Sequence, residues 1–158
     1  MSHENFIGVG GLVVKSNSYL LVKHTYGEYN GSWIIPGGHV KAGEPLHVAV
    51  EREVREETSV KALSQGIISV RSRSRGPSTT DCYIIFLMKY CEGEPLADNY
   101  EVDDARFFTF DEVNEMDNII GLSKIVIRQH AFNTLRFLPR NTDHDPYIPN
   151  CEHVQLFM

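Results

Sequence analysis

The stretch that decides the fold is residues 38–60, GHVKAGEPLHVAVEREVREETSV. No glycine or internal proline interrupts it from Pro45 to about Thr58, which predicts a helix with Pro45 in its first turn. A helical wheel puts an apolar stripe on one side of this helix, as expected for a helix that packs on a sheet. On that same side, within an arc of roughly 100°, lie three glutamates: Glu53, Glu56 and Glu57.

Three carboxylates on one helix face repel one another. Each like-charge pair at i,i+3 or i,i+4 costs a few tenths of a kcal/mol even in water, and the cost grows near a core unless the charges are paired or bind a metal. Converging carboxylate oxygens suit hard cations, Mg²⁺ above all, with Mn²⁺ as an alternative. The residues alone leave a second interpretation open, an exposed helix end stabilised by Arg52, Arg55 and Lys61.

The wider pattern resolves much of this choice. Gly38 to Val60 reads G-x5-E-x7-R-E-V-R-E-E-T-S-V, which resembles the Nudix box, G-x5-E-x7-R-E-U-x-E-E-x-G-U with U apolar. Ser59 stands where the family has glycine, and the other eight of nine specified positions match. The residues before the box, WIIPGG at 33–38, are similar to the family's W-x-x-P-G-G. So extended a pattern is far more specific than a lone glycine motif.

The resemblance implies an α/β (α+β) fold, a Nudix-type α/β/α sandwich with a mixed central sheet. The pattern of apolar runs and turn residues is compatible with it. This pattern predicts strands over residues 6–14, 19–24, 66–75, 81–90 and 104–110, and a closing helix over 122–135. Asp111 is expected to cap a short helix, and Ser59 to end the box helix in the left-handed conformation.

The resemblance also implies a function: water attacks a phosphoanhydride bond of a nucleoside diphosphate linked to a group X. Metal ions would neutralise phosphate oxygens and lower the pKa of a bound water. Pyrophosphohydrolysis of a nucleoside triphosphate, as in MutT-like members, is the favoured reaction. ADP-ribose or another dinucleotide, an RNA 5′ end, and a non-catalytic nucleotide-sensing role remain alternatives.

Site residues follow from the same resemblance. The implied metal shell contains a backbone carbonyl, taken as that of Gly37, and the side chains of Glu53, Glu56 and Glu57. Arg52 is expected to hold Glu53 or Glu44 by a forked hydrogen bond. The base stays open between Glu53, Glu56 and an acid from a later loop.

Three later features are candidates for the rest of the site, each with a structural alternative. Glu101, in an acidic cluster with Asp98, Asp103 and Asp104, is the favoured loop acid, unless that loop is merely solvated. Arg71 and Arg73 alternate on a predicted strand, so they share a face that binds phosphate or pairs with nearby acids. Trp33 stacks on substrate or packs in the core.

Length and composition limit the number of domains, the kinds of partner and the compartment that can be expected. The 158 residues amount to about one domain, predicted as residues 1–138 with an extension of unknown role at 139–158. The net charge of −6 argues against general nucleic-acid binding. No apolar run or basic leader predicts a membrane span or signal peptide, and three unpatterned cysteines favour a reducing compartment. We therefore expect a cytoplasmic monomer or homodimer whose partner is a nucleotide or a nucleotide-linked small molecule.

Overall fold

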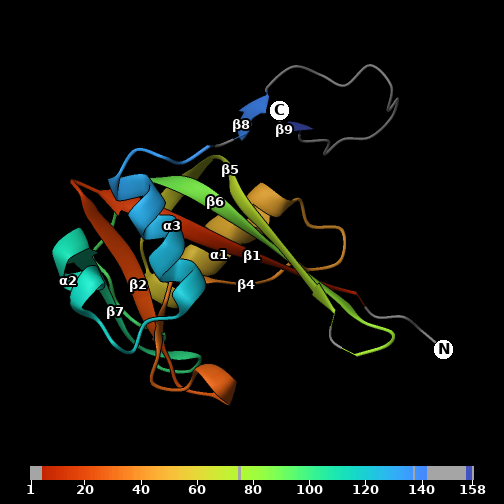
Figure 1. The fold of residues 1–158 in the computed structure, drawn as a ribbon, viewed down its shortest axis with the longest axis horizontal. Coiled ribbons are helices and arrows are strands. Elements are labelled where there is room, and N and C mark those ends of the chain that lie inside the picture. The colour runs from red at the N-terminus through yellow and green to blue at the C-terminus, as the bar shows by residue number, and fades with distance from the viewer. Residues whose placement is uncertain (1–4, 75, 137, 142–155, 158) are drawn as a thin grey trace.

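The computed structural model describes residues 5–74, 76–136, 138–141 and 156–157. Its central feature is a mixed sheet (Figure 1). Strand β1 (Phe6–Lys15) runs parallel to β6 (Thr80–Glu92), which pairs antiparallel with β5 (Lys61–Ser74). β5 also pairs antiparallel with β8 (Leu138–Asn141), and β8 with β9 (Leu156–Phe157).

A second group of strands lies along the edge of β1 that faces away from β6. β2 (Ser18–His24) pairs with the end of β1 and, along its length, with β7 (Val102–Thr109), both antiparallel. β3 (Trp33–Ile34) pairs with β2. β4 (Gly37–His39) pairs antiparallel with β1. The glycines that precede the box helix are therefore held as a short strand against the sheet.

Helices cover both faces of the sheet. On one face α1 (Leu46–Thr58) packs against side chains of β1 and β6 that include Val9, Val13, Phe86 and Met88. On the other face α2 (Phe110–Glu115) and α3 (Gly121–Ala131) pack against the intervening residues, among them Leu12 and Ile85. This division follows the alternation of side chains along a strand. The expected α/β/α sandwich is confirmed.

Several boundaries differ from the prediction. Pro45 is the N-cap of α1, with φ −65° and ψ 145°, so the helix begins one residue later. The short helix is capped by Thr109, not by Asp111, because Thr109 and Glu112 form a reciprocal capping box. The closing helix ends at Ala131 and not near Leu135; two residues on, Asn133 has a φ of 54°.

The end of α1 agrees with the prediction. Ser59 has φ 59° and ψ 2°, the left-handed conformation, and its N–H donates to the carbonyl of Arg55 at 2.9 Å. This is the conformation for which glycine is the usual residue. Ser59 therefore fills the family's glycine position with the same backbone geometry.

The two ends of the chain are described only in part. β8 adds residues 138–141 to the sheet, while residues 142–155 and 158, most of the expected extension at 139–158, lie outside the described residues. Within the described part of the chain, no helix is both long and apolar enough to cross a membrane.

Candidate active site

Arg52 of α1 is the centre of a carboxylate network that also includes Glu44, in the loop before the helix. Its Nε and Nη2 donate to the two oxygens of Glu44 at 2.7 and 2.9 Å. Its Nη1 donates to Glu53 at 2.7 Å and to Glu56 at 3.0 Å, and Nη2 also reaches the carbonyl of His39. The forked bond to Glu44 lowers the pKa of that carboxyl to about 2. Arg52 thus holds both of the carboxylates between which the sequence left a choice.

Glu57 is the buried member of the set, with 2% of its surface exposed. Its Oε2 accepts the backbone N–H of Gly37 at 2.9 Å, whereas its Oε1 is buried without a hydrogen-bond partner. Burial raises the pKa of Glu57 well above its usual value, and nearby Glu53 and Glu101 add to the shift. Such a carboxylate is costly to keep charged unless a cation binds it.

Glu53 lies against Gly38. A Cβ added at Gly38 would come within 2.6 Å of the Glu53 carboxyl carbon, so only glycine leaves room for this carboxylate. Burial raises the pKa of Glu53 although Arg52 acts to lower it. Gly38 of the box and Glu53 are therefore one packed unit.

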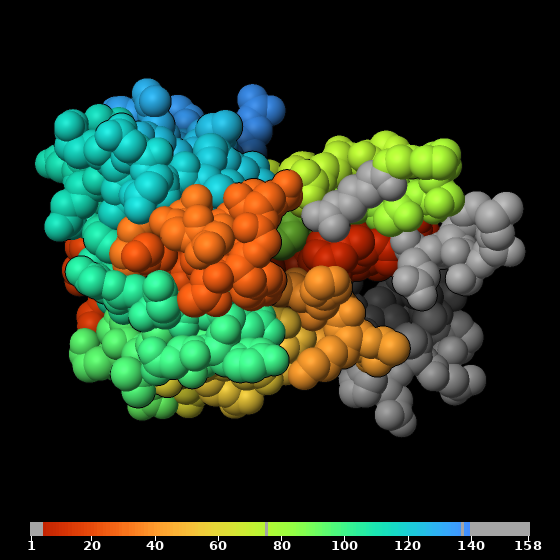
Figure 2. All heavy atoms as spheres, turned by 90° about the horizontal axis from the view of Figure 1, so that it is seen from below, coloured from red at the N-terminus to blue at the C-terminus, as the bar shows by residue number. Residues whose placement is uncertain are grey.

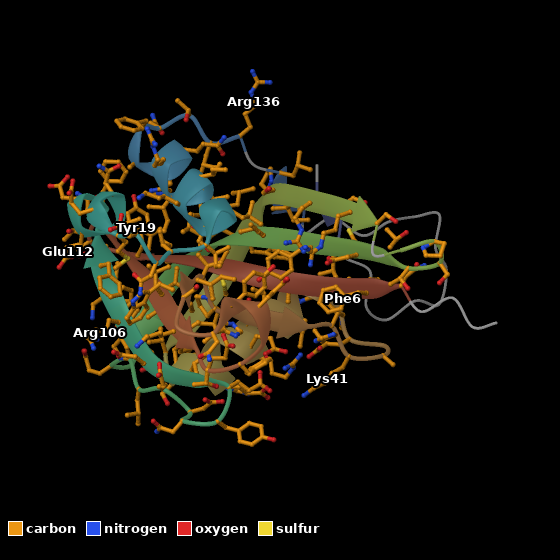
Figure 3. All side chains as sticks on the ribbon, turned by 60° about the horizontal axis from the view of Figure 1, so that its bottom comes forward. Phe6, Tyr19, Lys41, Arg106, Glu112 and Arg136 are labelled. Carbon is orange, nitrogen blue, oxygen red and sulfur yellow. The ribbon has the colours of Figure 1, made fainter. Side chains whose placement is uncertain are left out.

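Glu56 differs from the other two. Half of its side chain is exposed, and it is bonded to Arg52. Lys41, which Figure 3 labels in the loop before α1, places its Nζ 4.0 Å from the other oxygen of Glu56. Solvent exposure therefore increases across the three glutamates of the acidic stripe, from buried Glu57 through half-buried Glu53 to exposed Glu56.

The donor set suits a hard divalent cation. Carboxylate oxygens are the ligands that Mg²⁺ and Mn²⁺ take, and Glu57 offers one buried oxygen that nothing else satisfies. Among the described residues, no three histidine, cysteine, aspartate or glutamate side chains already converge as a cage. In this structure the carboxylates of Glu53 and Glu56 are hydrogen-bonded to Arg52.

Glu101 reaches the site from the loop before β7. Its Oε2 accepts a hydrogen bond of 3.4 Å from the Tyr26 hydroxyl, and its carbonyl accepts from Thr25. Asp98 shapes this loop, because its Oδ1 accepts the backbone N–H groups of the residues at 100, 101 and 102. Asp104 belongs elsewhere, since it pairs with Arg106. The predicted acidic cluster is thus divided: Glu101 and Asp98 lie near enough to Glu57 of α1 to add to its raised pKa, whereas Asp104 lies elsewhere.

A pocket of about 370 Å³ adjoins these carboxylates. Figure 2 shows it as a hollow between the orange segment that holds η1 (Gly27–Tyr29) and the yellow-green end of β5. Gly37 and Gly38 form the wall next to the glutamates. The remaining walls carry aromatic and basic side chains, notably His24, Tyr26, Tyr29, Tyr83, Arg71 and Arg73.

Arg71 and Arg73 share one buried partner. Arg71 Nη2 and Arg73 Nε donate to the two oxygens of Asp81 at 2.9 and 2.7 Å. Burial acts to raise the pKa of Asp81, but the hydrogen bonds from both arginines outweigh it and the pKa is lowered. The expected pairing with an acid is what the structure shows; both arginines also line the pocket, and phosphate binding stays a prediction.

Trp33 lies in the core and outside the pocket lining. Only 8% of it is exposed, and its ring meets that of Phe108 edge-on at 4.7 Å between centroids. The guanidinium of Arg106 lies 5.8 Å from the centre of the Trp33 ring, and Figure 3 shows Arg106 well apart from Lys41. The core alternative is the one that the structure shows, so the expectation of substrate stacking by Trp33 is corrected.

Sequence reasoning missed three residues here: Tyr83 and His24, which line the pocket, and Asp81, which pairs with its two arginines. Asp81 carried a usable signal, as a lone carboxylate on an apolar strand opposite the arginine strand of a predicted hairpin. Tyr83 is directly opposite Arg71 in that hairpin, and its ring lies 5.2 Å from the Arg71 guanidinium. His24 lines the pocket with a buried Nδ1 that has no partner, and nothing in the sequence distinguished it from other histidines.

Comparisons with known proteins agree with this geometry. A family model described as NUDIX domain matches residues 4–129. A protein of Methanocaldococcus jannaschii named ADP-ribose pyrophosphatase is 31% identical over 125 residues, which are 78% of this chain and 72% of that protein. A protein of Erwinia tasmaniensis named NAD-capped RNA hydrolase NudC is 32% identical over 92 residues, 58% of this chain but only 34% of that protein. Nudix hydrolase 2 of Arabidopsis thaliana is likewise longer, and the chain covers 40% of it.

Solved structures share the fold. A NUDIX hydrolase from Nitrosomonas europaea superposes with a TM-score of 0.71 at 21% identity, covering 85% of this chain and 94% of that one. A MutT NUDIX hydrolase from Burkholderia pseudomallei gives 0.69 at 23% identity, covering 80% and 98%. At these identities the likeness concerns the fold.

Proposed function

The chain belongs to the Nudix hydrolase family, whose members cleave pyrophosphate bonds, and from that premise we propose that it hydrolyses a nucleoside diphosphate linked to a group X with the help of Mg²⁺. The observation that carries the proposal is Glu57, a buried carboxylate with one unsatisfied oxygen beside the glycine wall of the pocket. Burying such a group has no benefit for folding, but it suits cation binding.

Glu53, Glu56 and Glu57 are the residues proposed to hold the metal, with the Gly37 carbonyl as a fourth donor. A bound divalent cation would supply charge neutralisation at the phosphate oxygens and a water of lowered pKa. Arg52 orients Glu53 and Glu56 through its hydrogen bonds. Glu53, Glu56 and Glu101 are the carboxylates proposed to accept the proton of the attacking water, and the raised pKa of Glu53 favours that role.

The pocket is proposed to hold the nucleotide. Tyr26 and Tyr29 offer aromatic faces, while Arg71 and Arg73 offer guanidinium groups that match phosphate oxygens. Nucleoside triphosphates are the first candidate substrates. ADP-ribose is the second, favoured by the name of the 31% identical archaeal relative.

A screen tests the proposal. Nucleoside triphosphates, ADP-ribose, dinucleotides and 5′-triphosphate RNA are each incubated with Mg²⁺ or Mn²⁺, and the products are identified. We expect a nucleoside monophosphate from at least one class, and no product with Glu57→Gln. Mg²⁺ should also raise the melting temperature of the wild type, as a native-state ligand does. Nucleotide binding without any product would instead support the non-catalytic sensing role.

A further inference from the structure

The distal half of the β5–β6 hairpin carries a unit with no part in the carboxylate site. Figure 1 shows this hairpin extending past α3, away from α2 and β7. Arg73 is directly opposite Asp81 and Arg71 directly opposite Tyr83, so the four side chains share one face of the sheet. Arg71, Arg73 and Tyr83 line the pocket from that face.

Asp81 is buried to an unusual degree for a carboxylate, with 0% of it exposed. It is bonded to a different nitrogen on each arginine, Nη2 of Arg71 and Nε of Arg73. One carboxylate therefore fixes the planes of two guanidinium groups that repel each other as like charges. Two positive groups and one negative group leave the unit a net charge of +1 at the pocket wall.

Each guanidinium has nitrogens that Asp81 does not occupy. The Nε of Arg71 is buried and has no hydrogen-bond partner. The Nη2 of Arg73 approaches Glu28 of η1, but at 3.9 Å, beyond a hydrogen bond. Guanidinium groups in fixed orientation bind phosphate oxygens through paired N–H groups.

The pocket connects this unit to the reaction centre. Tyr83 lies between Arg71 and Gly37. Its ring is next to the Arg71 guanidinium, and its hydroxyl is so close to Gly37 that a Cβ added at Gly37 would lie 2.8 Å from it. Gly37 in turn donates to Glu57. A substrate with one phosphate beside Glu57 therefore has the arginine unit within the same pocket for its second anionic group.

We infer that Asp81 is a positioning residue: it aligns Arg71 and Arg73 as one anion-binding unit, which holds the phosphate beside the one attacked. The inference rests on the proposed function for the identity of the substrate, but the unit itself is defined by its contacts. Asp81 acts through the two arginines and does not itself touch the substrate.

The direction in which Asp81→Asn changes the affinity for an anion distinguishes a positioning role from a purely electrostatic one. Asp81→Asn removes a negative charge bonded to two arginines of the pocket wall, so a purely electrostatic effect would make an anion bind more tightly. Loss of alignment predicts the opposite, weaker binding. Glu28→Gln is the matched control, because it also removes a negative charge near Arg73 but from an exposed side chain without a hydrogen bond to it.

The probe is ADP-ribose, and its equilibrium dissociation constant is measured in EDTA so that no metal contributes. For Asp81→Asn we expect the dissociation constant to rise by roughly tenfold or more, the scale of a lost charge-assisted contact. For Glu28→Gln we expect an equal or lower constant. With Mg²⁺, the KM of Asp81→Asn should rise similarly while kcat changes by less than about threefold. An unchanged or tighter constant for Asp81→Asn would overturn the inference.

A second variant covers the case in which Asp81→Asn does not fold. Arg73→Lys keeps the charge but loses the planar fork, and we expect it to weaken ADP-ribose binding while the melting temperature stays close to that of the wild type. Wild-type affinity in Arg73→Lys overturns the inference, as does a wild type that binds neither ADP-ribose nor ATP. Weakened binding in the variants of a wild type that hydrolyses nothing would sustain the inference and refute the proposed function.

Discussion

At the scale of single residues, Gly38 is required by the carboxylate that lies against it. A Cβ at this position would meet the end of the Glu53 side chain, a flexible group, and no backbone atom is among its nearest contacts. We expect Gly38→Ala to displace the Glu53 carboxylate at little cost in stability. Turnover should fall at least about tenfold, the lower range for a misplaced catalytic group, while the melting temperature changes little.

Gly121 provides the control for this substitution. A Cβ there meets no atom within 4 Å, so Gly121→Ala should leave both turnover and melting temperature near those of the wild type. Steady-state kinetics and thermal unfolding of the two variants make the comparison. Full activity in Gly38→Ala would show that Glu53 need not occupy its observed position.

Ser59 carries the one departure from the family pattern. Its left-handed conformation costs a non-glycine residue roughly 1 kcal/mol, and the greater unfolded-state entropy of glycine offsets part of that cost. We therefore expect Ser59→Gly to stabilise the protein by about 0.5 kcal/mol, or a rise of about 1–2 °C in melting temperature. Turnover should not change, since the side chain is not a proposed ligand. A lower melting temperature in Ser59→Gly would contradict this account of the helix end.

At the scale of elements, the bond from Arg52 to Glu44 ties α1 to the loop before it. The folded-state pKa of Glu44 is about 2, below the ordinary 4.5, so the folded protein favours the charged carboxylate. This contribution to stability is fully present above pH 4.5 and is lost as the pH falls from there toward 2. Glu44→Gln should therefore lower the free energy of unfolding by about 3 kcal/mol at pH 7 and by about half of that or less at pH 3.

Denaturant unfolding of wild type and variant at several pH values measures this difference. Glu92→Gln, which breaks the exposed ion pair with Lys61, is the control and should cost less than about 1 kcal/mol at either pH. If Glu44→Gln lowers the free energy of unfolding by the same amount at pH 3 and at pH 7, the charge of Glu44 contributes nothing to stability.

The elements also show what local pattern can and cannot predict. The box helix and its left-handed end were predictable, because an uninterrupted run and a chain-terminating position are local features. The cap of α2 was misplaced by two residues, since Thr109 and Asp111 are both good caps and only Glu112, three residues after Thr109, distinguishes them. The end of the closing helix was misplaced for a similar reason, because Leu135 continues the apolar pattern after the backbone has turned.

At the scale of the whole molecule, the limits of prediction are set by long-range contacts. The resemblance to the Nudix box sufficed for the fold and for the position of the glutamates. It did not show that Tyr26 meets Glu101 across 75 positions of sequence, or that Asp81 holds both arginines. Trp33 illustrates the opposite error, because its place beside a glycine-rich turn suggested the pocket whereas packing with Phe108 draws its ring into the core.

The proposed metal site depends on the carboxylate of Glu57, and one measurement tests that site most directly. Turnover of wild type and Glu57→Gln is compared at saturating Mg²⁺ on the best substrate of the screen, with thermal unfolding to verify that the variant is folded. We predict a loss in kcat of at least about 100-fold, the scale for removal of a charge-stabilising group. Turnover close to that of the wild type in a folded Glu57→Gln variant would contradict the proposed metal site.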